Sequence, residues 1–312
     1  MNKPEVIILT GPTASGKTSL SISLAKKIYK KTGKSVEIIS ADSRQVYRQI
    51  PVTTAQPSAE ELKLFKHHFI NELELDENFN AGEFGSKARK LINEILIDGK
   101  IPLVVGGSGL YVNSLVYGFF DIAGDDKQLE EKFKEKREEL YRIKEEKGFD
   151  YLLNELKIHD PELFSAMKEV KERRVIRALE VFYVTGIPIS VHQKKKIEIN
   201  FTPSVYGIQM DRSELYSRIN ERVLKMIQTG MIEEIKKLKD KGYHYKTHNS
   251  LNTVGAKEVF DYLEGMIDKE KMVSLIQQNT RRFAKRQMTW FRRDENIKWI
   301  SGVSEIDIKE ID

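Results

Sequence analysis

The chain has 312 residues, enough for one large domain or two ordinary ones, and its composition is that of a protein with an ample core. It contains no cysteine, which excludes disulfide and thiol chemistry, and no apolar run of membrane-spanning length or secretory leader, so we expect a cytoplasmic protein with no membrane partner. The net charge of +5 is only mildly basic and does not by itself identify a partner.

The first predicted elements are a strand over residues 6–9 and a helix that begins near residue 17. A glycine-rich loop connects them: Gly11, Pro12, Thr13, Ala14, Ser15, Gly16, Lys17 and Thr18. This is the signature of a phosphate-binding loop, because its backbone N–H groups wrap an anion and the helix N-terminus adds positive partial charge. Lys17 is placed to reach the terminal phosphates, and the Thr18 hydroxyl is placed to ligate Mg²⁺. We therefore expect the chain to hold a di- or triphosphate.

A second strand is predicted over residues 36–40, and Asp42 follows it closely. In open α/β sheets, ligands bind outside the carboxyl ends of the strands, so Asp42 should lie near the phosphate loop. Its carboxylate suits two roles, as a Mg²⁺ ligand or as a general base. The Asp-Ser-Arg run is also compatible with a simple turn or helix cap.

A helix around residues 83–97 and a buried strand over residues 101–105 come next, and this alternation predicts a parallel sheet flanked by helices. The Asp that would end this strand in an ATPase is missing. Residues 106–111 form instead a second glycine-rich turn that has Ser108 at its centre. Backbone dipoles and a hydroxyl suit a site that stabilises a leaving diphosphate.

The pattern changes near residue 121, and we predict an all-helical insertion over residues 119–200. Its first part, from Asp125 to Gly148, is dense in Glu and Lys, and breaks are expected near Asp160 and Gly186. A return strand is predicted over residues 205–210, then helices to about Arg293, then a last strand over residues 297–300. The predicted architecture is a P-loop NTPase-like α/β core of residues 1–118 and 201–312 that carries the insertion.

Basic residues gather in three places in the second half of the chain: residues 173–177, 194–196 and 281–293. Such clusters are usually solvated helix faces, but together they indicate a polyanionic partner larger than a nucleotide. The aromatic residues Trp290 and Phe291, beside the last cluster, are expected to lie in the core.

These motifs, in this order, resemble the tRNA dimethylallyltransferases (tRNA isopentenyltransferases), which modify adenosine 37 beside the anticodon. The resemblance spans about residues 5–293. The stretches that carry it are residues 11–18, 42–45 with Tyr47, 106–111, 173–181 with Thr185-Gly186, Leu215-Tyr216 with Arg218-Ile219 and Arg222-Val223, and 280–291.

The resemblance implies transfer of a dimethylallyl group from dimethylallyl diphosphate to N6 of the adenosine, with Mg²⁺ as cofactor, tRNA as partner and a monomeric enzyme. It implies that Asp42 is the base, that Ser108 donates to the leaving oxygen and that Arg218 neutralises the diphosphate held by residues 11–18. The residues implied to contact tRNA lie in the core and the insertion: Asp42, Ser43, Arg44, Gln45, Arg173, Arg174, Val175, Ile176, Arg177, Gly255, Lys257, Arg281, Lys285, Arg286 and Gln287.

Three positions depart from the family pattern. Ser108 replaces the usual Thr, which keeps the hydroxyl but loses the methyl group that restricts its rotamer. Ala256 stands where an aromatic residue is common. Residues 168–172 replace a polar Asn-Asp element before the 173–177 cluster, so the start of the tRNA-contact region is open there.

Three other functions remain open from the residues. A small-molecule kinase would use the same loop to transfer the γ-phosphoryl group of ATP, although the strand over residues 101–105 lacks an acidic end. A prenyltransferase acting on free adenine nucleotides would not need the insertion or the basic C-terminal helix. A non-catalytic RNA-binding protein would have no need for intact Lys17, Thr18 and Asp42.

Overall fold

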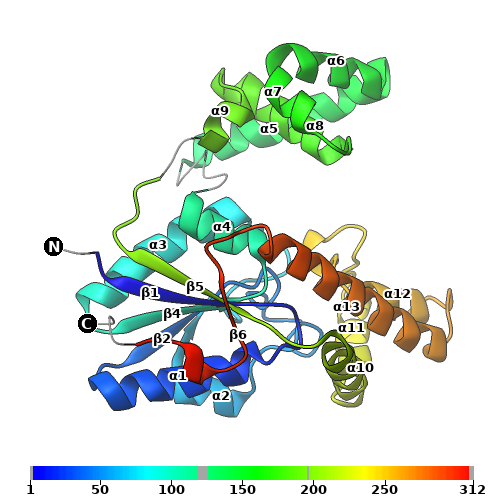
Figure 1. The fold of residues 1–312 in the computed structure, drawn as a ribbon. Helices are drawn as coiled ribbons and strands as arrows, with labels where there is room; N and C mark the ends of the chain where they lie inside the picture. The colour runs from blue at the N-terminus through cyan, green and yellow to red at the C-terminus, as the bar shows by residue number, and fades with distance from the viewer. Residues whose placement is uncertain (1–2, 119–121, 123–125, 195–196, 309–312) are drawn as a thin grey trace.

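A single parallel sheet organises the molecule. The computed structural model describes residues 3–118, 122, 126–194 and 197–308. The six-stranded sheet has the order β3-β2-β4-β1-β5-β6, and every neighbouring pair is parallel (Figure 1). The strands are β1 (Glu5–Thr10), β2 (Val36–Ser40), β3 (Lys66–His68), β4 (Ile101–Gly106), β5 (Thr202–Ile208) and β6 (Lys298–Ile300).

Both faces of the sheet are buried, which explains why its central strands are continuous apolar runs. In β1, Val6 and Ile8 belong to one apolar cluster and Ile7 and Leu9 to another, because successive side chains of a strand point to opposite faces. Helix α1 (Lys17–Thr32) packs on the Ile7 and Leu9 face. Helices α3 (Ala81–Ile97) and α4 (Gly109–Tyr117) pack on the other.

The predicted parallel α/β sheet is confirmed, and the predicted strands match β1, β2, β4, β5 and β6 within a few residues. Two elements were not predicted, α2 (Ala59–Leu64) and the edge strand β3. Strand β3 is three residues long and reads Lys-His-His, so it has no apolar signal. It pairs with β2 because the chain leaves α2 beside that edge.

Between α4 and β5 the regular elements of the described residues are helices: α5 (Lys127–Lys147), α6 (Phe149–His159), α7 (Pro161–Ala166), α8 (Glu172–Thr185) and α9 (Ile189–Lys194). These helices share an apolar cluster of their own, which contains Leu140, Leu152 and Leu179, and Figure 1 shows them grouped apart from the sheet. The buried Asp160 carboxylate explains the predicted break, since it accepts hydrogen bonds from the backbone N–H groups of Leu163 and Ser190. The predicted start of the insertion at residue 119, and Asp125, lie outside the described residues.

Within residues 209–308, four α-helices follow β5 and lie to one side of the sheet (Figure 1): α10 (Arg212–Gln228), α11 (Met231–Asp240), α12 (Ala256–Leu263) and α13 (Lys269–Phe291). Short 3-10 turns occur at η1 (Asn249–Leu251) and η2 (Val303–Glu305). Phe291 is buried and Trp290 packs against the main core, as expected from the sequence. In the part of the chain that the structure describes, no helix is long and apolar enough to cross a membrane.

Candidate functional site

The glycine-rich loop lies where β1 ends and α1 begins. Gly16 precedes α1 in the left-handed region, at φ 86°, a conformation that side chains with a β-carbon rarely adopt. The Lys17 ammonium folds back across the loop and donates to the carbonyl oxygens of Gly11, at 3.0 Å, and Pro12, at 2.7 Å. The loop therefore presents a helix N-terminus and a cation at one point, which is the arrangement that binds phosphate.

The environment of Lys17 is short of negative charge. Burial, together with the nearby Arg222 guanidinium, lowers the pKa of Lys17 to about 7, and the Asp42 carboxylate partly opposes the shift. A buried lysine whose pKa is lowered to near neutral pH by burial and a neighbouring cation is typical of a site that binds an anion.

Arg222 is a site residue that the sequence analysis did not assign. Burial lowers the pKa of Arg222, and the Asp42 carboxylate acts in the opposite direction, so all three charged groups belong to one cluster. Arg218 lies one turn earlier on α10, and a β-carbon at Gly16 would be 3.7 Å from its Nη1 atom. The spacing of four residues between two arginines on a helix was the signal available in the sequence.

Asp42 lies just beyond β2, as predicted. Its Oδ1 atom accepts hydrogen bonds from the backbone N–H groups of Arg44, at 2.9 Å, and Gln45, at 3.4 Å. These bonds hold the carboxylate as in a turn cap, yet Lys17 and Arg222 lie within electrostatic reach of it. The capping and functional interpretations of Asp42 are therefore compatible.

Ser108 is brought to the same place by the second glycine-rich turn. Its backbone N–H donates to the carbonyl of Ala41 at 3.2 Å, and its Oγ accepts a hydrogen bond from the Ser43 backbone N–H at 3.1 Å. A hydroxyl that accepts one bond keeps its proton for a second one. The structure thus places Ser108 beside the Asp42 segment with a proton to donate.

Arg44 and Gln45 are occupied within the protein. The Arg44 guanidinium donates to the carbonyl oxygens of Asn249, at 2.8 Å, and Ser250, at 3.3 Å. The Gln45 amide donates to the Ala55 carbonyl at 3.2 Å and its Oε1 accepts from the Ser40 hydroxyl. Both side chains shape the segment that carries Asp42, and in this conformation neither presents its polar atoms to a base edge.

The basic residues of α13 divide into held and exposed ones. Arg281 donates to the Asn220 side chain at 2.6 Å, so it ties α13 to α10. Lys285 and Arg286 are exposed, and the Arg286 guanidinium lies 5.7 Å from the ring centre of Phe283. An exposed cationic surface with an accessible aromatic ring is suited to RNA.

The predicted contact residues on α8 divide in a similar way. Arg173 and Arg174 are exposed. Val175 and Ile176 are in the apolar core of the insertion, with 0% and 2% of their surface exposed, so these two side chains are not accessible to tRNA in this conformation. Arg177 pairs with the buried Glu180 at 2.7 Å.

Gly255 and Lys257 lie at the start of α12. The Gly255 backbone N–H donates to the buried Glu258 carboxylate at 2.7 Å, and Asn279 of α13 donates to its other oxygen at 2.7 Å. Lys257 lies over the Tyr245 ring at 5.8 Å. Glu258 therefore fixes the N-terminus of α12 against α13, which sequence reasoning did not anticipate.

The donor set suits a phosphate-bound Mg²⁺ ion better than a metal held by protein alone. Among the described residues, no group of three or more His, Cys, Asp or Glu side chains could hold a metal. The Thr18 hydroxyl and the Asp42 carboxylate are hard oxygen donors, and Mg²⁺ is commonly held by one or two such groups together with substrate phosphates. In the loop, the buried Ser15 hydroxyl has no hydrogen-bond partner within the described residues, as expected of a group that lines a ligand site.

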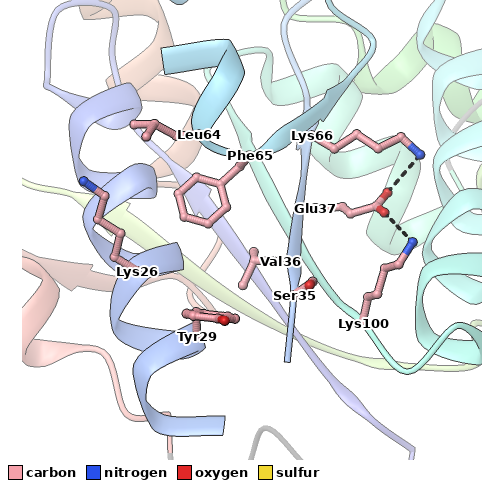
Figure 2. A pocket seen from close by; sticks show the side chains of 9 residues that line it. All are labelled: Lys26, Tyr29, Ser35, Val36, Glu37, Leu64, Phe65, Lys66 and Lys100. Carbon is pink, nitrogen blue, oxygen red and sulfur yellow. Dashed lines mark hydrogen bonds and ion pairs between the residues drawn. The ribbon is translucent and has the colours of Figure 1, made fainter. Parts of the chain in front are cut away.

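A hollow of ≈ 490 Å³ lies at the opposite, amino end of the sheet (Figure 2). Two of its lysines pair with its carboxylate: Lys100 and Lys66 both contact Glu37, at 2.8 and 3.4 Å. The phosphate loop, Asp42 and Ser108 do not contribute to it. The hollow is therefore separate from the candidate site.

Comparison with known proteins gives one consistent result. Residues 45–294 match the family model described as IPP transferase, a stretch that includes Ser108, Arg218 and α13 and begins just after Asp42. The tRNA dimethylallyltransferase of Natranaerobius thermophilus is 41% identical over 306 residues, which cover 98% of this chain and 89% of that protein. That of Acetivibrio thermocellus is 43% identical, over 95% of this chain and 91% of that protein.

Solved structures agree. The tRNA isopentenylpyrophosphate transferase of Bacillus halodurans is 37% identical, with a TM-score of 0.67 over 98% of this chain and 92% of that one. A eukaryotic dimethylallyltransferase described as acting on tRNA is 28% identical, with a TM-score of 0.77 over 98% of this chain and 76% of that one. The family model matches most of this chain, and these relatives match nearly all of it. The chain therefore belongs to the IPP transferase family.

Proposed function

We propose that this chain transfers a dimethylallyl group from dimethylallyl diphosphate to N6 of adenosine 37 in tRNA. The observation that carries the proposal is a cluster in which Lys17, Asp42 and Ser108 follow the carboxyl ends of β1, β2 and β4 and Arg222 of α10 adds a second cation. Two cations and a helix N-terminus suit a leaving diphosphate, and a carboxylate next to them suits an amine that must lose a proton.

The reaction breaks the bond between the allylic carbon and the diphosphate oxygen and forms a bond from that carbon to N6. Lys17, Arg218 and Arg222 neutralise the charge that develops on the diphosphate, and Ser108 donates its remaining proton toward the bridging oxygen. Asp42 accepts the proton that N6 loses. Electrons balance because the pair of the broken bond leaves with the diphosphate.

Mg²⁺ would be held by the Thr18 hydroxyl and by the diphosphate. When bound, the ion supplies charge stabilisation to the phosphate oxygens. The residues of the chain then keep the tasks of gripping the diphosphate, orienting the allylic carbon and accepting the proton.

The exposed cationic side chains are proposed to bind the tRNA. Lys285 and Arg286 on α13, with Arg173 and Arg174 on the helical insertion of residues 119–200, are proposed to hold the anticodon arm through its phosphates. The target base must leave its stack to reach Asp42, which costs a few kcal/mol and is cheapest in a single-stranded loop. We also propose that the enzyme is a monomer and acts in the cytoplasm.

The test combines the purified chain, Mg²⁺, labelled dimethylallyl diphosphate and unmodified tRNA, and measures label in the RNA. Transfer to tRNA that is lost in Asp42→Asn supports the proposal, and mapping of the label to adenosine 37 completes it. Labelling of free adenine nucleotides instead of tRNA, or release of γ-phosphate from ATP onto a small acceptor, would replace it with one of the alternative functions.

A further inference from the structure

The side chain of Gln287 joins three separate parts of the molecule. It belongs to α13 and only 8% of its surface is exposed. Its Oε1 accepts a hydrogen bond from the backbone N–H of Thr13 in the phosphate loop at 2.8 Å. Its Nε2 donates to the carbonyl of Gly107 in the second glycine-rich turn, also at 2.8 Å. One amide therefore bridges the two turns that surround the proposed diphosphate.

Helix α13 packs so closely against the second glycine-rich turn that the turn has no room for side chains at Gly107 and Gly109. A β-carbon at Gly107 would lie 2.5 Å from Gln287 Nε2, and one at Gly109 would lie 2.2 Å from Trp290 Cδ1. Gln287 and Trp290 are three residues apart and so share one face of α13. The glycines at positions 107 and 109 are thus needed for the close packing of α13 against this turn.

The loop that Gln287 holds is strained. Ala14 has φ 64°, in the left-handed region that residues with a β-carbon avoid. Such a conformation persists only when neighbouring structure holds it. The neighbour of Ala14 is Thr13, and the Thr13 N–H is anchored by Gln287. Ala14 also packs against the cluster of Leu215, Ile219 and Ala284. The Gln287 hydrogen bond is the polar part of this restraint, and its loss would let the Thr13 N–H turn away from the position in which the loop binds an anion.

The same helix carries the exposed cations proposed to bind RNA. Lys285 and Arg286 directly precede Gln287, and they are exposed while Gln287 is buried. Because Gln287 uses Oε1 and Nε2 inside the protein, it does not act as a reader of base edges in this conformation. A shift of α13 on RNA binding would reach the phosphate loop through this amide, and also through Ala14, which packs against a cluster that contains Ala284 of α13.

We propose that Gln287 is a positioning residue that holds the phosphate loop in its diphosphate-binding shape and links the affinity for diphosphate to the occupancy of α13 by tRNA. The proposal rests on the proposed function for the identity of the two ligands. Linkage of this kind is reciprocal, so each ligand changes the affinity for the other by the same factor.

The experiment compares Gln287→Leu with Gln278→Leu, the same change at an exposed position of the same helix. Titration calorimetry measures inorganic diphosphate with Mg²⁺ in the absence and presence of an anticodon stem-loop RNA. We expect Gln287→Leu to lower the affinity for diphosphate about tenfold or more, because the partly buried Thr13 N–H and the buried Gly107 carbonyl lose their partners. We also expect the RNA to change diphosphate affinity severalfold in the parent chain and in Gln278→Leu, and by a clearly smaller factor in Gln287→Leu.

Gln287→Glu serves as a second variant should Gln287→Leu fail to fold, since its carboxylate still accepts from Thr13 but cannot donate to Gly107. Thermal unfolding and RNA affinity without diphosphate report on the fold of each variant. Unchanged diphosphate affinity in a folded variant, or an equal loss for both ligands, would overturn the proposal. Inorganic diphosphate needs no turnover, so this result is separate from the labelling test of the proposed function. Steady-state kinetics should show a raised KM for dimethylallyl diphosphate rather than a uniform loss of kcat.

Discussion

The two ends of the sheet treat charge in opposite ways. At the amino end, the buried Glu37 is paired with Lys66 and Lys100 at 3.4 and 2.8 Å (Figure 2), and also with His68 at 2.6 Å. Burial alone raises the pKa of Glu37, but the hydrogen bonds from Lys100 and His68 and the charge of Lys66 lower it to about 2.

At the carboxyl end, Lys17 and Arg222 lie together, with Asp42 as the acidic group that opposes their shifts. Burial and a like charge lower the pKa of Lys17, which means that the cluster is under-compensated. A charge that is satisfied within the fold contributes to stability, whereas cations held together with too little counter-charge contribute to binding. The following predictions separate these two cases.

The largest effect is expected for Asp42→Asn. The amide keeps an oxygen that accepts from the Arg44 and Gln45 backbone, but it cannot take a proton, so we expect turnover to fall about 10²–10⁴-fold with tRNA affinity nearly unchanged. Single-turnover transfer and a binding titration measure the two quantities. Turnover close to that of the parent chain would remove Asp42 from the chemistry and leave only its capping role.

Lys17→Met should lower turnover by about 10²–10³-fold, as for the loss of one group that stabilises transition-state charge. Its matched control is Lys100→Met, which removes a lysine from the amino end of the same sheet. We expect the control to lose stability and keep its affinity for diphosphate, and Lys17→Met to do the reverse. If both variants bind diphosphate equally well, the contrast between the two ends is wrong.

The sequence predicted the parallel sheet and the cluster of Lys17, Asp42 and Ser108 because each depends on a local pattern. A buried parallel strand is a short apolar run, and a phosphate loop has a fixed spacing of glycines. The carboxyl ends of neighbouring parallel strands meet at one edge, so residues that follow different strands are brought together by topology alone.

The rest depends on contacts that no local pattern encodes. Gln287 was expected to face RNA, yet a residue of a helix far along the chain can turn inward only because that helix docks on Gly107 and Gly109. Val175 lies beside the exposed Arg174 in the sequence, but helical periodicity turns its side chain into the core. Strand β3 was missed because its polar residues follow the edge of the sheet rather than an apolar pattern.

Glu37→Gln tests the amino end. The folded-state pKa of Glu37 is lowered from 4.5 to about 2, so its stabilising effect is complete above about pH 4.5 and is lost as the pH falls toward 2. This lowering of the Glu37 pKa corresponds to at most about 3 kcal/mol in the free energy of unfolding. We expect the parent chain to lose more stability than Glu37→Gln between pH 5 and 3 in denaturant titrations, while prenyl transfer at neutral pH stays within about twofold. Parallel acid profiles would contradict the pairing of Glu37.

The carboxyl end should show proton uptake on ligand binding. Lys17 is mostly neutral above pH 7 in the free site, and a bound diphosphate favours its charged form, so its pKa rises in the complex. Binding at pH 8 should then take up close to one proton, and affinity should fall by up to about tenfold per pH unit above 7. Calorimetry in buffers of different ionisation enthalpy measures the uptake. Lys17→Arg, which stays charged, should abolish it, and equal uptake by both proteins would assign the proton to another group.

The smallest effect is expected for Arg286→Ala, in a comparison with Lys30→Ala. Both residues are exposed and both substitutions remove one positive charge, but Lys30 lies on α1 away from the α13 surface. If Arg286 contacts one RNA phosphate, its loss should lower the slope of log affinity against log salt by about 0.7–0.9, because one fewer counterion is released. Lys30→Ala changes the net charge equally and should leave the slope as it is. A slope that changes in both variants would mean that tRNA responds to the overall charge of the protein. A slope that changes in neither would mean that Arg286, despite its exposure, does not contact the RNA, and the anticodon arm would then have to be held by Lys285 and the arginines of α8.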